Sequence, residues 1–195
     1  MIVIVDTGCA NLRSLYNAVQ RLGSTPVVSS DPATIKAARR VFLPGVGSAG
    51  AAMRQMAERE LTDTLRALTQ PVLGICLGMQ LLARQSSESN VDCLQLIDAP
   101  VRELQAPRLP HMGWNQLAIK ASSPLFNGLT DDDWFYFVHS FMVPVGAYTL
   151  AESHHGEPFS AVIQHNNVLG TQFHPERSGK VGARLLNNFL ENDPC

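Results

Sequence analysis

The sequence of 195 residues contains only four cysteines, Cys9, Cys76, Cys93 and Cys195, and none of them forms a C-x-x-C pair. Such spacing supports neither a disulfide scaffold nor a zinc knuckle, and the six histidines show no metal-ligand spacing. The chain also lacks an opening apolar segment with a basic flank and any apolar run near the ~20 residues that cross a bilayer. We therefore expect free thiols, no metal, no membrane contact and a cytoplasmic location.

Charge of either sign is sparse as well. The 15 Lys and Arg residues nearly balance the 17 Asp and Glu residues, and the net charge of −2 is scattered along the chain. A basic face for nucleic acid or an anionic membrane is therefore missing. The length suits one domain, residues 1–195, that buries roughly 70% of its unfolded surface and so can hold a cleft in a real core.

Short apolar runs alternate with stretches of helical period in the N-terminal half. The predicted strands are residues 2–5, 26–29, 40–45 and 71–76, and the predicted helical stretches are 11–23, the segment from 31, 48–68 and 77–84. Four strand-then-helix units in succession indicate a parallel sheet with helices on both faces.

Shorter segments with turn residues between them follow residue 85. The segments WFYFVHSF, YTLAES, SAVIQH and NVLGTQF are typical of hairpin-connected strands, and residues 181–191 predict a last helix. The expected fold is therefore α/β: an open, mostly parallel sheet with helices on both faces and antiparallel strands added in the C-terminal half.

A cysteine between two glycines stands where the fourth predicted strand meets the next helix, in GICLGMQLL. Gly74 and Gly78 flank Cys76 with the spacing of a G-x-S-x-G nucleophile elbow in which Cys replaces Ser. The glycines allow a tight turn, and a helix N-terminus beneath the sulfur favours thiolate. This stretch alone leaves open whether Cys76 is a nucleophile or a packed, inert cysteine.

A base and an orienting acceptor for such a nucleophile are present in GTQFHPERSG. His174 and Glu176 lie two residues apart at the end of a predicted strand, so their side chains point to the same side and can form a hydrogen bond. By itself the pair could be a solvated loop. Together with the cysteine elbow it favours a Cys-His-Glu triad, which assembles in space rather than in sequence.

The other histidines carry less information. His154 and His155 stand beside a glycine in a predicted turn and should be solvent-exposed, and His165 ends a strand with no partner that we can name. His111 and His139 lie in aromatic-rich segments, where a structural histidine is the simpler interpretation.

The segment PGVGSAG, residues 44–50, formally matches the dinucleotide-binding pattern G-x-G-x-x-G. It follows the third predicted strand rather than the first, and a proline directly precedes its first glycine. Its exposed amides could equally form an oxyanion hole for acyl transfer from Cys76.

These motifs make the chain resemble the class I, triad-type glutamine amidotransferases, which have a flavodoxin-like fold. Narrower motifs resemble one branch of that family, the glutaminase subunits of imidazole glycerol phosphate synthases of histidine biosynthesis. The motifs are DTGCANL, FLPGVG, LPHMGWN, FVHSF and QFHPERSG.

The resemblance implies that Cys76 attacks the side-chain amide of L-glutamine, that His174 moves the proton and that Glu176 orients the imidazole. It assigns the oxyanion hole to Gly45, Val46, Gly47 and Leu77, and the glutamine contacts to Gly47, Gln80, Ser140 and Phe141. No cofactor is implied.

The resemblance also implies a heterodimer with a (β/α)₈-barrel cyclase subunit that receives the ammonia through a channel. The residues expected at that interface or at the channel mouth are His111, Met112, Trp114, Asn115 and His139. Two other functions stay open: a Cys-His-Glu hydrolase of related fold that cleaves peptides or small acyl compounds, and a non-catalytic nucleotide-binding protein built on residues 44–50.

Overall fold

The computed structural model describes residues 1–8 and 11–193, so the expectations for Cys9 and Cys195 lie outside the described residues. The helices are α1 (Leu12–Arg21), α2 (Pro32–Lys36), α3 (Ala49–Glu58), α4 (Leu61–Arg66), α5 (Leu77–Leu81) and α6 (Gly179–Glu191), with 3-10 turns η1 (Glu88–Asn90), η2 (Pro124–Phe126) and η3 (Pro175–Arg177). The first strands are β1 (Ile2–Val5), β2 (Val27–Ser29), β3 (Arg40–Gly45), β4 (Val72–Cys76), β5 (Gln85–Ser86), β6 (Val91–Asp92) and β7 (Pro100–Glu103). The later strands are β8 (His111–Gln116), β9 (Ala118–Ile119), β10 (Trp134–His139), β11 (Phe141–Met142), β12 (Thr149–His155), β13 (Glu157–His165) and β14 (Val168–Thr171). Among the described residues, no helix combines the length and the apolar character that a membrane span requires.

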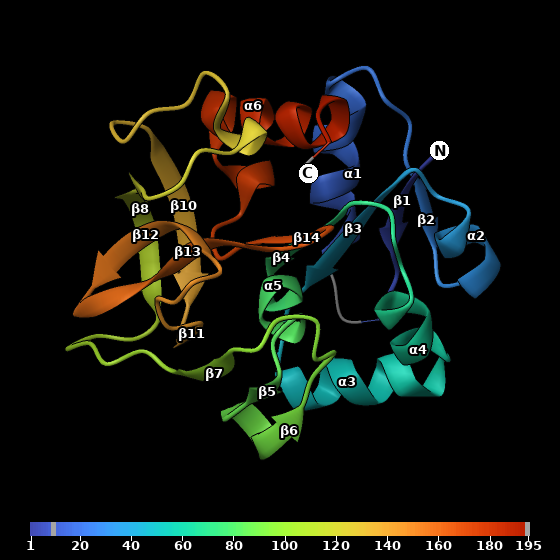
Figure 1. The fold of residues 1–195 in the computed structure, drawn as a ribbon, viewed down its shortest axis with the longest axis horizontal. Helices are drawn as coiled ribbons and strands as arrows, with labels where there is room; N and C mark the ends of the chain where they lie inside the picture. The colour runs from blue at the N-terminus through green and yellow to red at the C-terminus, as the bar shows by residue number, and fades with distance from the viewer. Residues whose placement is uncertain (9–10, 194–195) are drawn as a thin grey trace.

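An eight-stranded sheet with the order β2-β1-β3-β4-β14-β13-β12-β9 forms the centre of the fold (Figure 1). Strands β2, β1, β3, β4 and β14 run parallel to one another, and β13, β12 and β9 continue the sheet with antiparallel pairing. Helices α1 and α6 cover one face, and α3, α4 and α5 cover the other (Figure 1). This arrangement confirms the α/β fold class expected from the sequence.

Helices cover both faces of the sheet, and this explains why the parallel strands appear in the sequence as continuous apolar runs. In β1, Ile2 and Ile4 belong to the core that includes α1 and α6, whereas Val3 and Val5 belong to the core that includes α3 and α4. Both sides of each strand must therefore be apolar, and the alternation typical of a half-exposed strand disappears.

The predicted helical stretch 48–68 is wrong in one respect, because it forms two helices. Glu60 lies between α3 and α4 with a left-handed backbone (φ 59°) that interrupts the hydrogen-bonding pattern. The helix after Cys76 is also shorter than predicted, since α5 ends at Leu81. The helix in the predicted segment from 31 is capped by Asp31, whose side chain accepts a hydrogen bond from the Thr34 amide at 2.8 Å.

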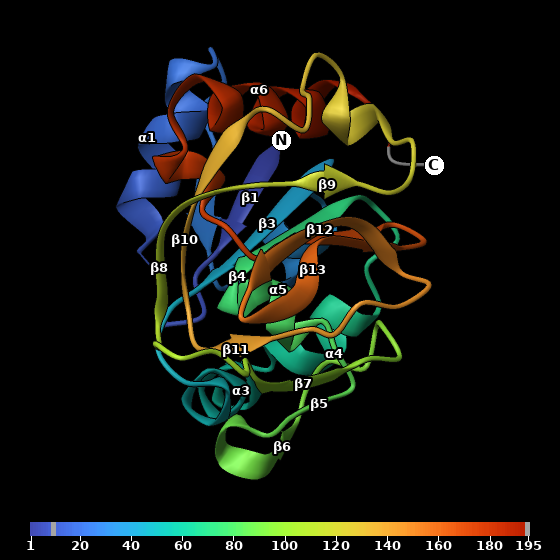
Figure 2. The same cartoon turned by 90° about the vertical axis from the view of Figure 1, so that its left-hand side faces the viewer.

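The predicted hairpin pairing is confirmed for β12, β13 and β14, which are antiparallel neighbours, whereas the aromatic segment pairs elsewhere. The aromatic segment forms β10, which pairs with β8 in a separate ribbon (Figure 2), and β11, which pairs with β7. Strand β14 lies between β4 and β13, parallel to the first and antiparallel to the second. Apolar patterning identifies a strand but not its neighbours, because contacts far apart in sequence decide the pairing.

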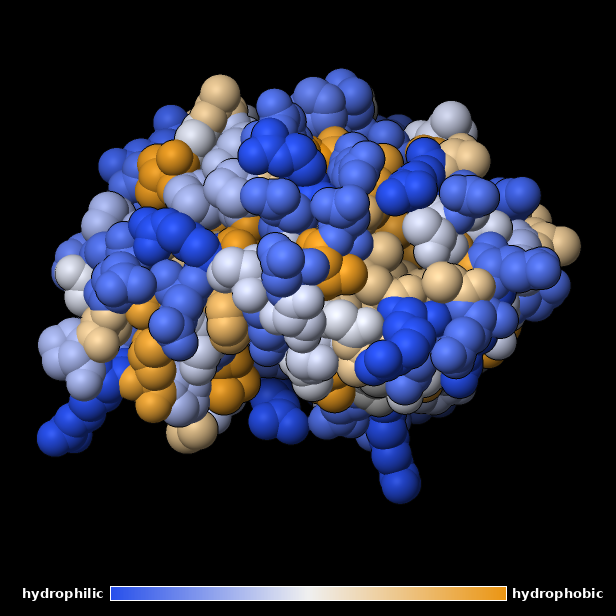
Figure 3. Space-filling model, turned by 90° about the horizontal axis from the view of Figure 1, so that it is seen from below, coloured by the Kyte–Doolittle hydropathy of each residue, from blue (hydrophilic) through white to orange (hydrophobic). Residues whose placement is uncertain are grey.

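The outer surfaces differ in polarity. Figure 3 shows the face nearest α3 and β6, where hydrophilic residues cover much of the surface and apolar side chains form small patches. On the β8–β10 ribbon, Met112, Trp114 and Trp134 lie on one face and are 63%, 52% and 51% exposed. The ribbon therefore presents large apolar side chains to the outside.

The carboxyl ends of β3, β4 and β14 meet at one edge of the sheet. Gly45 stands opposite Cys76 in the β3–β4 register, and Thr171 stands opposite Ile75 in the β14–β4 register. His174 follows β14 by three residues. Ligands bind at this edge in open α/β sheets, so the topology gathers the three predicted motifs where a site is expected.

Candidate active site

Cys76 occupies a strained turn between β4 and α5. Its backbone has φ 55° and ψ −110°, a conformation that non-glycine residues rarely adopt. A Cβ on Gly78 would overlap the carbonyl oxygen of Leu43, and one on Gly74 would lie 2.7 Å from the carbonyl oxygen of Gly78. The two glycines are therefore needed because the turn packs directly on β3 and on itself. Strain held in this way at a cysteine is typical of a functional site.

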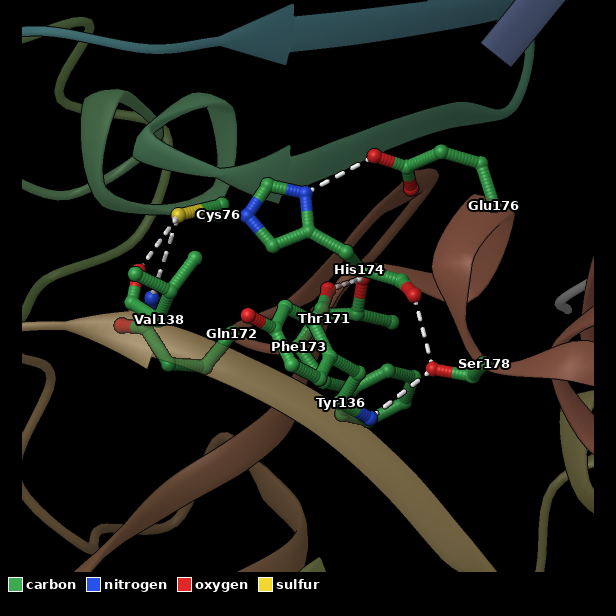
Figure 4. Close-up of polar contacts among 9 residues, drawn as sticks. All are labelled: Cys76, Tyr136, Val138, Thr171, Gln172, Phe173, His174, Glu176 and Ser178. Carbon is green, nitrogen blue, oxygen red and sulfur yellow. Dashed lines mark hydrogen bonds and ion pairs between the residues drawn. The ribbon is translucent and has the colours of Figure 1, made fainter. Parts of the chain in front are cut away.

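His174 and Glu176 flank the thiol from the segment that follows β14. The Nδ1 atom of His174 lies 2.8 Å from Oε1 of Glu176, and Figure 4 shows the other ring nitrogen turned toward the sulfur of Cys76. The amide of His174 donates to the Tyr136 carbonyl at 2.9 Å, and the Ser178 hydroxyl donates to the His174 carbonyl at 2.7 Å. The structure thus brings the three predicted catalytic side chains together.

The protonation of His174 depends on both neighbours. Burial lowers the pKa of the imidazole, but the hydrogen bonds and charges of Cys76 and Glu176 outweigh burial and raise that pKa from 6.5 to about 10. The ring is therefore an imidazolium at neutral pH. A cation beside a sulfur atom favours the thiolate, which is the nucleophilic form.

The second free cysteine in the described residues has the opposite environment. The Cys93 side chain is completely buried, and burial together with the negative charges of Asp92 and Glu88 raises the pKa of its thiol to about 11. A thiol of this kind stays protonated and unreactive.

A cavity of about 400 Å³ opens in front of the sulfur. Every residue predicted for the oxyanion hole and for glutamine except Gly45 lines this cavity: Val46, Gly47, Leu77, Gln80, Ser140 and Phe141. The predicted catalytic residues Cys76 and His174 and the predicted interface residue His139 also line it. Gly45 is absent from this lining. Instead it lines a smaller cavity of about 100 Å³, together with His174 and Glu176. The two cavities share Val46, Val138 and His174, so the imidazole lies between them.

Gln80 is less free to bind a ligand than the sequence suggested. Its Nε2 group donates both hydrogens to the protein, one to the carbonyl of Phe141 and one to Oε1 of Gln172, each at 2.9 Å. Only the Oε1 atom of Gln80 is left for a molecule in the cavity, and an amide oxygen can only accept hydrogen bonds.

His111 and His139 form a buried, directional pair. Nδ1 of His139 faces the carbonyl of Phe141 at 2.9 Å and must carry a hydrogen, since a carbonyl can only accept. Nε2 of His139 therefore accepts from Nδ1 of His111 at 3.0 Å. Burial is the main reason that the pKa of His111 falls to about 4 and that of His139 to about 3. Both rings are neutral at physiological pH.

The residues predicted to face a partner differ in exposure. Met112 and Trp114 are exposed, Asn115 is partly buried, and His111 and His139 are inside the protein. His155 was predicted to be solvent-exposed, which is wrong: its ring stacks on His111 with centroids 4.3 Å apart. It ends strand β12 rather than lying in a turn, so it packs against β8.

Four further residues at the site were not predicted from the sequence. Glu88, Pro110 and Val138 line the cavity, and Gln172 is completely buried with Nε2 3.8 Å from the sulfur of Cys76. The signal for Gln172 was its place two residues before His174, which puts both side chains on one side of an extended segment. No group of histidines, cysteines and carboxylates among the described residues could hold a metal ion.

Comparison with known proteins identifies the family. The model of the glutamine amidotransferase class-I family matches residues 3–192. The imidazole glycerol phosphate synthase subunit HisH of Escherichia coli (strain K12) is 55% identical over 193 residues, which are 97% of this chain and 98% of the relative. The chain belongs to the class-I glutamine amidotransferases, in their HisH branch.

Other relatives of this amidotransferase agree with that assignment. The HisH subunit of Vibrio cholerae serotype O1 is 52% identical over 198 residues, covering 97% of this chain and 98% of the relative. A solved glutamine amidotransferase structure superposes with a TM-score of 0.78 over 98% of both chains, at 21% identity. That distant likeness shows the shared fold of the amidotransferase.

Proposed function

We propose that this amidotransferase hydrolyses L-glutamine and passes the ammonia to a cyclase subunit, which makes imidazole glycerol phosphate and an aminoimidazole carboxamide ribotide in histidine biosynthesis. The HisH relatives support this function, because they are named as subunits of imidazole glycerol phosphate synthase. The observation that carries the chemistry is the His174 ring between the Cys76 thiol and the Glu176 carboxylate.

In the first half of the reaction, the Cys76 thiolate attacks the side-chain carbonyl carbon of glutamine. The carbon–nitrogen bond then breaks, and the nitrogen takes the proton from His174 and leaves as ammonia. A γ-glutamyl thioester remains on Cys76. In the second half, neutral His174 removes a proton from water, the resulting hydroxide attacks the thioester, and the sulfur leaves as thiolate with release of glutamate. Glu176 stabilises the imidazolium and keeps Nδ1 protonated.

The tetrahedral intermediates need donors for their oxyanion. The amide of Leu77 at the start of α5 is one proposed donor, and an amide of the Gly45-Val46-Gly47 segment is the second. Gly47 has φ +93°, a left-handed backbone conformation that residues other than glycine rarely adopt. We propose that the segment completes the hole when its Val46–Gly47 peptide reorients as the partner is engaged.

Acceptors in the cavity suit the α-ammonium group of glutamine. The Glu88 carboxylate lines the cavity, with Oε2 accepting from the Ala49 amide at 2.8 Å. The Oε1 atom of Gln80 is a second acceptor, because the Nε2 group of the same side chain already donates both of its hydrogens to the protein. We assign the ammonium to these two residues, and the γ-amide of glutamine to the side of Cys76.

The cyclase partner is proposed to be a (β/α)₈ barrel that docks on the outer face of the β8–β10 ribbon. The exposed Met112 and Trp114 suit an interface core, where large flexible and aromatic side chains are enriched. Asn115 is partly buried beside them, and the buried His111–His139 pair connects this ribbon to the wall of the cavity.

The two other functions considered are supported less well. At the start of α3, the amides that a dinucleotide phosphate would need are engaged, because Glu88 takes the Ala49 amide and Ser48 takes the Ala51 amide. A nucleotide site on residues 44–50 would have to displace both. A general Cys-His-Glu hydrolase would share the triad and differs only in substrate.

Glutamate release tests the proposed function directly. The chain should be purified with the cyclase subunit and assayed with glutamine, with and without the nucleotide that the cyclase uses. We expect turnover that rises with the nucleotide and disappears in the Cys76→Ala variant. Full glutaminase turnover by Cys76→Ala would refute the mechanism. Cleavage of peptides or esters, with no glutamate released from glutamine, would favour the hydrolase.

A further inference from the structure

A buried amide lies within hydrogen-bonding distance of the sulfur of Cys76. Gln172 is completely buried, and its Nε2 lies 3.8 Å from the sulfur, within the range of an N–H···S hydrogen bond (Figure 4). The thiol itself is placed to donate to the carbonyl of Val138, 3.7 Å away. The sulfur thus has one acceptor and one donor from the protein in addition to His174.

The orientation of the Gln172 amide follows from its neighbours. The Phe141 carbonyl can only accept, so the Gln80 atom 2.9 Å from it must be the NH₂ group. The same NH₂ group lies 2.9 Å from Gln172, so the Gln172 atom there must be its oxygen. The remaining end of the Gln172 amide, facing Cys76, is therefore NH₂, and a donor points at the sulfur.

Ionisation of Cys76 weakens its hydrogen bond with Val138 and strengthens its hydrogen bond with Gln172. In the thiolate form, beside the His174 imidazolium, the sulfur can no longer donate to Val138, and that contact loses its hydrogen bond. The N–H group of Gln172 then faces an anion, and hydrogen bonds to charged groups are stronger than neutral ones. The Gln172 donor therefore favours the form of Cys76 that attacks.

We propose that Gln172 is a further catalytic residue of this site, donating a hydrogen bond from Nε2 to the Cys76 thiolate while Gln80 holds the amide in place. This proposal deepens the proposed function and rests on Cys76 being its nucleophile. Gln172 does not line the cavity, so it acts on the sulfur rather than on glutamine.

Two substitutions separate a donor from a simple structural support. Gln172→Glu keeps an oxygen for Gln80 but places a carboxylate oxygen where the donor faces the sulfur, whereas Gln172→Met removes both the oxygen and the donor without adding a charge. Gln164→Glu, on β13 and away from the cavity, is the matched control for the chemical change. The titratable groups facing the same space are His174, with Glu176 behind it, His139 and Glu88, and none of them is substituted. Gln172→Glu adds one carboxyl group to this space, so Gln172→Met, which adds none, tests the loss of the donor without a new charge.

The readout is the rate at which iodoacetamide alkylates Cys76 in the full chain, followed by peptide mass spectrometry as a function of pH. We expect both Gln172 variants to react about tenfold more slowly at neutral pH, with their profiles displaced to higher pH, and the control to match the wild type. In the complex, kcat for glutamine should fall by a similar factor with KM unchanged.

Two results would overturn the proposal: wild-type alkylation by both Gln172 variants, or wild-type alkylation by Gln172→Glu alone, which would leave only a supporting role. If neither variant folds, the side-chain amide resonance of Gln172 in the wild type decides. It should shift as Cys76 ionises and stay fixed in Cys76→Ala, and a resonance that never moves contradicts the proposal. Alkylation needs no glutamine turnover, so failure of the proposed function is detected separately.

Discussion

Replacement of Glu176 by glutamine removes the charge behind His174 while keeping the shape of the side chain. The His174 and Glu176 side chains are only 9% and 7% exposed, so water screens their contact little. Oε1 of Glu176 lies 2.8 Å from Nδ1, and Oε2 is buried with no hydrogen-bond partner among the described residues. His174 is therefore the main partner of this carboxylate.

The expected loss follows from that geometry. A hydrogen bond to a charged group contributes about 1.5–3 kcal/mol, and each 1.36 kcal/mol is tenfold in rate, so kcat should fall by roughly 10- to 150-fold. If the new amide turns its NH₂ group toward Nδ1, the imidazole takes the wrong tautomer and the loss reaches about 10⁴, the size known for serine-protease triads. KM should stay the same, because Glu176 does not line the cavity of about 400 Å³.

Steady-state glutamate release by the complex measures both constants. Glu152→Gln is the matched control, since Glu152 forms a surface ion pair with Lys120 at 3.2 Å. That control should keep the wild-type kcat. A Glu176→Gln variant with kcat within twofold of the wild type, or with its loss confined to KM, would refute the role given to this carboxylate.

Three other outcomes follow from the site. Because the pKa values of His111 and His139 lie at about 4 and about 3, below the ordinary 6.5, the unfolded chain takes up protons that the folded chain does not. The free energy of unfolding should therefore fall as the pH drops from about 6.5 toward 4, and urea midpoints that do not decrease would contradict this. Gly78→Ala forces the elbow away from the Leu43 carbonyl, so thermal unfolding should report a loss of about 2 kcal/mol or more and glutamate release should cease; a normal melting temperature with normal kcat would contradict the packing. Glu88→Gln should raise KM for glutamine about tenfold with kcat unchanged, and a KM within twofold of the wild type would remove Glu88 from the substrate site.

Local patterns in the sequence were enough to predict much of the fold and part of the site. Apolar runs located β1, β3 and β4, and the spacing of Gly74, Cys76 and Gly78 located the elbow, because a tight strand-to-helix turn places its own demands on the residues that form it. The His174–Glu176 contact was predictable for the same reason, since both side chains belong to one short extended segment.

Contacts between distant parts of the chain were not predictable in this way. Gln172 reaches Gln80 across 92 residues, and Gln80 reaches the Phe141 carbonyl across 61, so no local pattern encodes this network. Glu88 lies in a short 3-10 turn whose place at the cavity depends on docking against α3. The stacking of His155 on His111 depends likewise on β12 packing beside β8.

The central claim is that Cys76 carries the glutamyl group during turnover. The complex should be mixed with glutamine, quenched in acid within the first turnovers and digested for peptide mass spectrometry. We predict a γ-glutamyl thioester on the peptide containing Cys76 in the wild type, and none in Cys76→Ala, which should also release no glutamate. Glutamate released by Cys76→Ala at the wild-type rate, or a glutamyl adduct found only on another residue, would contradict the claim.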